Sequence, residues 1–172
     1  MERRQILDYL ARLHAEVDRL AAELAAPLPL RCGLGCCDCC VDELTVFEVE
    51  AARIREQHAS LLAEAEPGVV GRCAFLDDEG ACRVYAERPY VCRSQGLPLR
   101  WVEEESAEPA AEYRDICPLN EAVDPAALEP EQCWTLGPVE ERLSLLQRLF
   151  AEQAGSDPGA RVGLRGLFAR TR

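Results

Sequence analysis

The feature that most constrains this chain is a run of five cysteines within nine residues, from Cys32 to Cys40. Thiolates held so close together repel one another and oxidise readily, whereas a soft or borderline metal needs several of them converging on one point. Five further cysteines follow at wider spacing: Cys73, Cys82, Cys92, Cys117 and Cys133. The pattern therefore predicts a metal-binding protein.

A disulfide framework is the alternative use of ten cysteines. The N-terminus runs directly into an amphipathic segment without the apolar stretch of a secretory signal, so we expect a reducing cytoplasm, where cysteines more often serve metal or redox chemistry. The adjacent pairs 36–37 and 39–40 also offer poor disulfide geometry. No apolar run approaches the roughly 20 residues of a membrane span, so we expect no membrane segment.

Composition bounds the fold and the partners. The chain has 172 residues, of which 48% are hydrophobic, enough for one folded domain with a modest core. Its net charge of −12 excludes DNA as the main partner and disfavours RNA, because phosphate binding needs a basic surface. We expect a protein partner if there is a macromolecular one.

A long N-terminal helix is predicted over residues 1–26. An apolar residue recurs every three or four positions and forms one narrow stripe: Ile6, Leu10, Leu13, Val17, Leu20 and Leu24. That spacing suits packing on another helix, either in this chain or in the second copy of a homodimer. We expect packing within the chain, with His14 beside the stripe and in solvent.

Periodicity, Pro and Gly predict the remaining elements. The next predicted element is a helix that opens with a capping box at 45–48 and carries His58 at the core edge. A hairpin over 73–85 and a helical turn from Pro89 follow. A two-stranded ribbon of 97–105 and 112–116, joined by a turn at 106–111, comes before a short helix from Pro125 and a long helix over 138–154. We therefore expect an α+β fold that is mostly α. It is one small domain over 1–172, in which helices brace irregular cysteine-rich loops around a core at 31–118, with a short β-hairpin. The basic tail at 160–172 should lie on the acidic surface.

The cysteines outnumber the four ligands of one tetrahedral ion, so the spacing favours several metals or a polynuclear cluster. A position one turn into the helix after Pro89 should favour the thiolate of Cys92. Arginines flank several cysteines, and guanidinium groups can offset thiolate charge and donate hydrogen bonds to sulfur. Arg93 is the best such candidate to contact a cofactor, followed by Arg88.

The motifs Cys32-x3-Cys36-x2-Cys39-Cys40, Cys73-Ala-Phe-Leu, Gly80-Ala-Cys82-Arg-Val-Tyr85, Arg88-Pro89-x2-Cys92-Arg93 and Cys117-Pro118 resemble the YkgJ-like CxxCxxCC family, described as zinc- or iron-chelating domains. The resemblance covers residues 31–118. It implies eight metal ligands: Cys32, Cys36, Cys39, Cys40, Cys73, Cys82, Cys92 and Cys117. Two cysteines depart from the pattern. Cys37 could bind the metal in place of Cys36, or bind no metal. Cys133 is expected to be a buried apolar side chain near Trp134.

The resemblance supplies ligands rather than a reaction. The related flagellin lysine methylases carry a similar cysteine set thought to hold an iron–sulfur cluster, so an iron–sulfur cluster or iron, used in redox transfer, sensing or metal handling, is the first expectation. A zinc-stabilised interaction module is the second. A metal-dependent modification enzyme is the third, although the chain has no Gly-rich phosphate loop, Ser/His/Asp set or HExxH motif.

Overall fold

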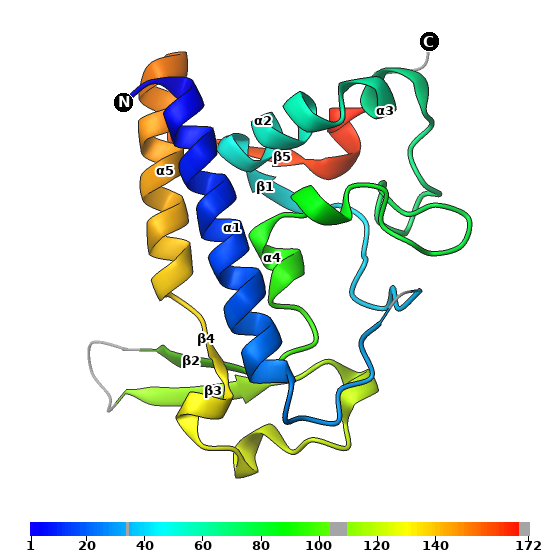
Figure 1. The fold of residues 1–172 in the computed structure, drawn as a ribbon, viewed down its shortest axis with the longest axis vertical. Helices are drawn as coiled ribbons and strands as arrows, with labels where there is room; N and C mark the ends of the chain where they lie inside the picture. Colours follow the sequence, from blue (N-terminus) through cyan, green and yellow to red (C-terminus); the bar gives the residue numbers. More distant parts are fainter. Residues whose placement is uncertain (34, 104–109, 169–172) are drawn as a thin grey trace.

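Two long antiparallel helices, α1 (Arg3–Ala25) and α5 (Pro138–Ala154), lie side by side along the length of the computed structural model (Figure 1). The structure describes residues 1–33, 35–103 and 110–168. Most of the predicted turn at 106–111, together with Arg170 and Arg172 of the predicted tail, lies outside these residues. The expected α+β class is confirmed, with helices dominating and two small sheets. None of the described helices combines the length and apolar character needed to cross a membrane.

The apolar stripe of α1 is buried within the chain. Ile6, Leu10, Leu13 and Val17 are each at most 3% exposed and pack in one core with Val139, Leu143, Leu146 and Phe150 of α5. The apolar stripe of α1, which could also have formed a homodimer, is therefore buried within the chain, as expected. A dimer through α1 would need another face of the helix.

The second helix begins later than predicted and is interrupted. Residues Thr45–Phe47 form a strand, β1, rather than a capping box, and the helical residues divide into α2 (Glu48–Gln57) and α3 (Ala59–Glu64). β1 pairs antiparallel with β5 (Arg161–Gly163), which lies in the predicted basic tail. That tail was wrongly placed on the surface: the turn that follows β5, η5 (Leu164–Leu167), buries Leu164 and Leu167.

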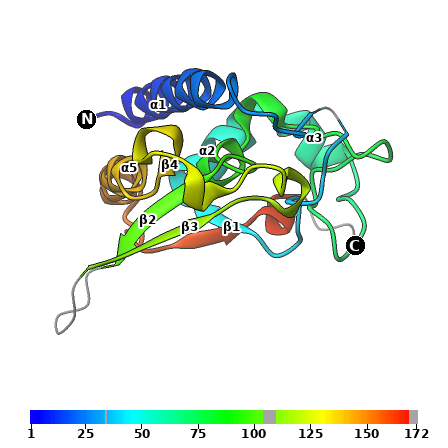
Figure 2. The same cartoon turned by 90° about the horizontal axis from the view of Figure 1, so that it is seen from below.

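A three-stranded sheet forms the other end of the molecule, in the order β3-β2-β4. β2 (Leu99–Glu103) and β3 (Ala111–Asp115) make the predicted ribbon, which projects from the body (Figure 2). β4 (Trp134–Thr135) pairs parallel with β2. The predicted hairpin at 73–85 is reduced to one bridge between Leu76 and Cys82, because the chain turns into η1 (Tyr85–Glu87) before a second pair can form. Three further 3₁₀ turns are η2 (Pro118–Asn120), η3 (Pro125–Ala127) and η4 (Pro130–Gln132).

Helix α2 joins two apolar clusters. Val49 and Ala52 face the α1–α5 cluster, whereas Ala51 and Ile54 face a second cluster built from η5 and the loop at 73–76. Phe75 and Phe168 pack in the second cluster with ring centroids 5.1 Å apart. The cysteine-bearing loops therefore rest on a core that the C-terminal segment completes.

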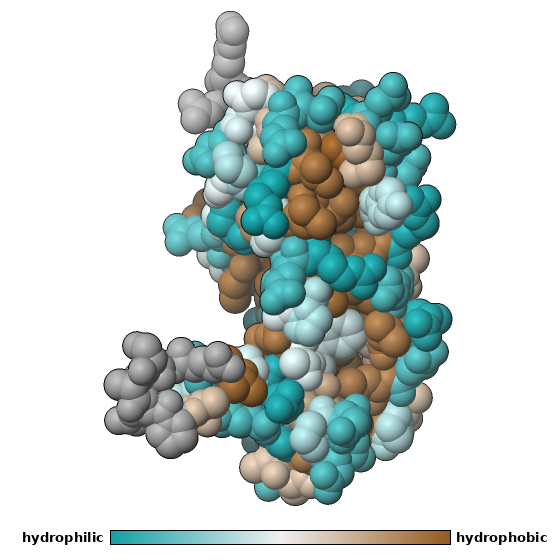
Figure 3. Space-filling model, turned by 90° about the vertical axis from the view of Figure 1, so that its left-hand side faces the viewer, coloured by the Kyte–Doolittle hydropathy of each residue, from teal (hydrophilic) through white to brown (hydrophobic). Residues whose placement is uncertain are grey.

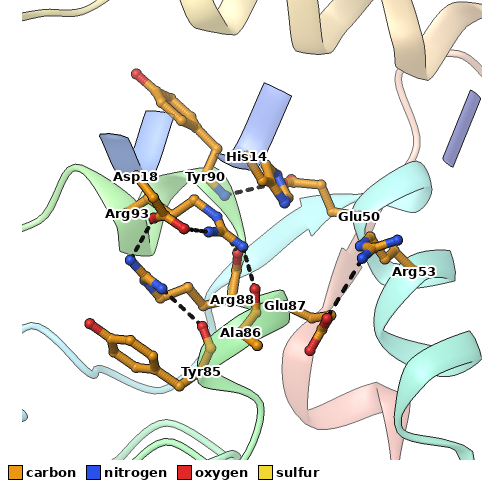
Figure 4. A network of polar contacts seen from close by, with 10 residues as sticks. All are labelled: His14, Asp18, Glu50, Arg53, Tyr85, Ala86, Glu87, Arg88, Tyr90 and Arg93. Atoms are coloured by element: carbon orange, nitrogen blue, oxygen red, sulfur yellow. Dashed lines mark hydrogen bonds and ion pairs between the residues drawn. The ribbon is translucent and has the colours of Figure 1, made fainter. Parts of the chain in front are cut away.

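A buried polar network ties α1 to the short helix α4 (Tyr90–Arg93), as Figure 4 shows. Arg88 and Arg93 both pair with Asp18 of α1, and Arg93 also donates to the carbonyls of Arg88 and Ala86, at 2.8 Å each. Glu50 of α2 accepts the amide of Tyr90 at 2.8 Å. These contacts fix the start of α4, and thereby the position of the residues that follow it.

His14 is buried in this network, not in solvent as predicted. Its side chain points at Glu50, with Nε2 3.5 Å from the Glu50 Oε1, and neither ring nitrogen has a hydrogen-bond partner among the described residues (Figure 4). Burial is the main cause that lowers the pKa of His14 below its usual value. His14 is therefore neutral in the folded protein at neutral pH.

We predict that His14→Leu weakens the acid sensitivity of the fold. Because the folded pKa of His14 lies below the unfolded value of about 6.5, the unfolded chain binds more protons, and His14 removes stability as pH falls through that value. At pH 7.5 the variant should be within about 1 kcal/mol of the original, since Leu removes two unsatisfied nitrogens. The check is urea unfolding of both metal-free proteins between pH 7.5 and 5. Parallel pH curves for the two would contradict this assignment.

Candidate metal centre

The eight cysteines of the family pattern lie on three loop segments and on helix α4, on one side of the molecule. The segment between α1 and β1 carries four of them together with Cys37, and its backbone is tied to the next by a bridge between Val41 and Arg72 and by the Cys73 amide, which donates to the Cys40 carbonyl at 3.0 Å. In Figure 1 these loops lie on the side of α4 away from α5. All ten cysteines are free thiols, so the disulfide alternative has no support in the structure.

Four thiols form what we call the inner group: Cys40, Cys73, Cys82 and Cys92. Burial raises the pKa of Cys73 and of Cys82. It also raises the pKa of Cys92 to about 12, and the nearby thiols of Cys73 and Cys82 add to that shift. The expectation that the helix start would favour the Cys92 thiolate is wrong for the metal-free protein, because desolvation dominates in so short a helix.

Cys39 and Cys40 share a hydrogen bond. Donation from Cys40 lowers the pKa of Cys39 to about 6, while the same interaction and burial raise the pKa of Cys40. Cys73 and Cys92 lie near enough to raise the pKa of Cys40 further. Cys39 is therefore the thiolate of this pair at neutral pH and stands at the edge of the inner group.

The outer group consists of Cys32, Cys36 and Cys117, with Cys39 next to it. Burial is the main cause that raises the pKa of Cys32, and the other three thiols contribute through their charge. The eight cysteines that the family pattern implies are thus linked by electrostatic interactions into one set. Cys39 and Cys40, adjacent in the sequence, are the connection between its two groups.

Asn120 holds the outer group together and has no counterpart in the predictions. It is fully buried in η2, three residues after Cys117. Its Oδ1 accepts the amide of Arg31 at 2.7 Å, and its Nδ2 donates to the Gly96 carbonyl at 2.8 Å and to the Cys32 Sγ at 3.3 Å. Gly96 has φ +88°, and a Cβ at this residue would collide with the Cys32 Sγ, so glycine is required there.

A second brace comes from the C-terminal segment. Both nitrogens of the Arg165 fork contact Asp42, at 2.9 Å each, and the same guanidinium donates to the carbonyls of Gly68, Val69 and Arg72. The hydrogen bonds from Arg165 are the main cause that lowers the pKa of Asp42 to about 2. The position of Asp42, two residues after the cysteine run, could have marked it as part of the site. Nothing in the sequence around Arg165 indicates its role.

Arginine does reach sulfur, but from a different position than predicted. Arg72 Nη2 donates to the Cys37 Sγ at 2.6 Å. Arg88 and Arg93 instead contact Asp18 and backbone carbonyls, and within the described ranges neither donates to a thiol. Cys133 is buried beside Trp134, as expected, with Arg114, Glu112 and Arg100 as its charged neighbours.

The donor set suits a thiolate-bound metal by its chemistry, since several soft ligands share one region. Within residues 1–33, 35–103 and 110–168, however, no three Cys, His, Asp or Glu side chains meet closely enough to hold an ion as they stand. Apart from Cys92, the eight lie outside the helices and strands. A metal held by this set would therefore need the thiols to move closer together, while the braces at Asn120 and Asp42 keep the ends of the loops in place.

We predict that Asn120→Leu destabilises the metal-free protein by about 1–3 kcal/mol, because it leaves the buried Gly96 carbonyl and the partly buried Arg31 amide without their partner. Asn120→Asp retains the acceptor but loses both donors, so it should also be destabilised. Glu121→Gln, at the exposed neighbouring residue, is the control. Denaturant unfolding measures all three. An unfolding free energy for Asn120→Leu within about 0.5 kcal/mol of the control would show that Asn120 is not a brace.

Comparison with known proteins agrees with this arrangement. The model of the family CxxCxxCC, described as "Putative zinc- or iron-chelating domain", matches residues 31–118. No curated protein and no solved structure matches the chain. The matched segment encloses both thiol groups, leaves out Cys133 and spans just over half of the chain. The protein is a member of the CxxCxxCC family, whose description supports metal binding by these cysteines.

Proposed function

We propose that the eight clustered cysteines bind iron, as an iron–sulfur centre, and that the protein serves redox transfer, sensing or metal handling in a reducing cytoplasm. The observation that supports this most is the linked set of thiols, which contains every cysteine implied by the family pattern. Free thiols throughout the chain agree with a reducing compartment. The similarity to the cysteine set of flagellin lysine methylases favours iron over zinc.

The grouping of the thiols suggests two centres rather than one. Cys40, Cys73, Cys82 and Cys92 would supply one set of four, and Cys32, Cys36 and Cys117 the other, together with Cys39, which also lies near enough to Cys92 to raise its pKa. Successive side chains diverge, so Cys39 and Cys40 would each serve a different centre. Four thiolates satisfy either one iron–sulfur cluster or one tetrahedral ion.

Zinc is the second candidate, and the same grouping is the observation that favours it. Two sets of four thiolates match two structural zinc sites, in which the metal folds the loops and does no chemistry. The protein would then present a zinc-stabilised surface to a protein partner. The two candidates bind at the same cysteines and differ in the metal they retain.

We predict a brown protein after anaerobic purification, with broad visible absorbance that dithionite bleaches, and with iron and acid-labile sulfide in comparable amounts. Elemental analysis of the same sample separates the candidates. A colourless protein with two zinc ions per chain would establish the second candidate. A protein that takes up neither metal, in cells or on reconstitution, would refute both.

Single substitutions test the ligand set. Cys92→Ser removes an inner ligand and Cys32→Ser an outer one, so each should lose about half of the metal and at least about 3 kcal/mol of stability in the metal-bound protein, because binding and loop closure are coupled. For a chain of this size that lowers Tm by about 6–12 °C. Cys133→Ser, outside both groups, is the matched control and should retain full metal content. Equal metal content in all three variants would contradict the assignment.

A further inference from the structure

The outer edge of β4 is unpaired. The amide of Trp134 donates to the carbonyl of Pro98, just before β2, at 2.7 Å, and the amide of Leu136 to that of Arg100 in β2 at 2.8 Å. Because backbone groups alternate along a strand, the amide and carbonyl of the intervening Thr135 face the opposite edge. The Thr135 amide has no hydrogen-bond partner in the part of the chain that the structure describes. An open edge of this kind accepts another strand.

An open cleft runs along this edge. It has a volume of about 480 Å³ and is lined by Leu20, Glu23, Leu24, Glu131, Cys133, Trp134, Thr135 and Val139. In Figure 1, β4 leads into the start of α5 and passes beside the last turns of α1. The face of the molecule drawn in Figure 3 carries hydrophobic patches among hydrophilic residues, in both its upper and its lower part. Leu20, at one wall of the cleft, is 37% exposed although it belongs to the α1 stripe.

The charged groups that line the cleft are both acidic. Glu131 is exposed on η4, and its carboxylate has no ion-pair partner among the described residues. Glu23 pairs with Arg19 on the surface of α1, where both side chains are 60% exposed, and such a pair contributes little. With a net charge of −12 for the whole chain, the cleft favours a basic occupant.

We propose that this cleft, which we call the β4 cleft, binds an extended basic and apolar segment of a partner protein, which adds a strand to the edge of the β3-β2-β4 sheet. The Thr135 amide and carbonyl would pair with the backbone of the segment. Alternate apolar side chains would contact Leu20, Leu24 and Val139, and flanking Lys or Arg side chains would face Glu23 and Glu131. This is strand addition, in which the backbone supplies affinity and the pockets supply specificity. The β4 cleft does not depend on the identity of the metal.

The test uses a fluorescein-labelled pentapeptide of alternating arginine and valine and the full-length, metal-loaded protein. Fluorescence anisotropy should show saturable binding. A peptide methylated on the backbone nitrogens that would pair with β4 should bind at least about tenfold more weakly, as should one with glutamate in place of arginine. Backbone NMR should show the Thr135 amide becoming protected from hydrogen exchange when the unmodified peptide is added. Binding that is insensitive to backbone methylation would overturn strand addition.

Variants of exposed residues locate the binding site without threatening the fold. Glu23→Arg/Glu131→Arg should weaken the peptide about tenfold or more while leaving metal content and Tm unchanged. Thr135 is half-buried, so Thr135→Pro, which removes the edge donor, is compared with the original protein for Tm and metal content first; with both retained it should abolish binding. Glu64→Arg, at an exposed residue of α3 in another part of the fold, is the charge-reversal control. Unchanged affinity in the double variant would overturn the proposal, as would a dimer that already protects Thr135 in the absence of peptide.

Discussion

Desolvation of crowded thiols is the constraint on which the rest of this structure depends. Burial is the main cause that raises the pKa of Cys73, Cys82 and Cys92 in the metal-free protein, and neighbouring thiols raise the pKa of Cys82 and Cys92 further. A thiophilic cation reverses that balance, because it supplies the positive charge that buried thiolates lack. Metal binding by these thiols would therefore couple their deprotonation to their approach around the metal.

The remainder of the chain limits how far these loops can move. Asn120 ties the segment at Arg31 to Gly96, and Arg165 ties Asp42 to three carbonyls of the neighbouring loop. Arg93, anchored on Asp18 of α1, sets the position of α4 and hence of Cys92. Each tie is polar, comes from a different part of the chain and acts beside a cysteine. Together they reduce the conformational entropy that metal binding must overcome.

Elements that carry a periodic apolar pattern or a local Pro or Gly signal could be predicted from the sequence. Features that depend on contacts between residues far apart in the chain could not. Periodicity located α1 and α5, and the Pro and Gly positions located the starts of α4, η3 and α5. Thr45 resembles an N-cap locally, but pairing with β5, over a hundred residues later, makes it a strand. His14 sits beside the stripe, and only the packing of α2 and α4 against α1 buries it. The ion pairs of Arg88 and Arg93 with Asp18, 70 or more residues away, carry no local signal, and their contact with a cofactor stays a prediction.

The central claim, that loop thiols from both groups converge on metal, can be measured directly at the metal. X-ray absorption at the K edge of the metal that co-purifies with the anaerobic protein reports the atoms bound to it. We predict a first shell of sulfur alone, at about 2.3 Å if the metal is zinc, and for iron an additional metal–metal vector from a cluster. A first shell dominated by oxygen or nitrogen would contradict the account, since those ligands would have to come from outside the cysteine groups.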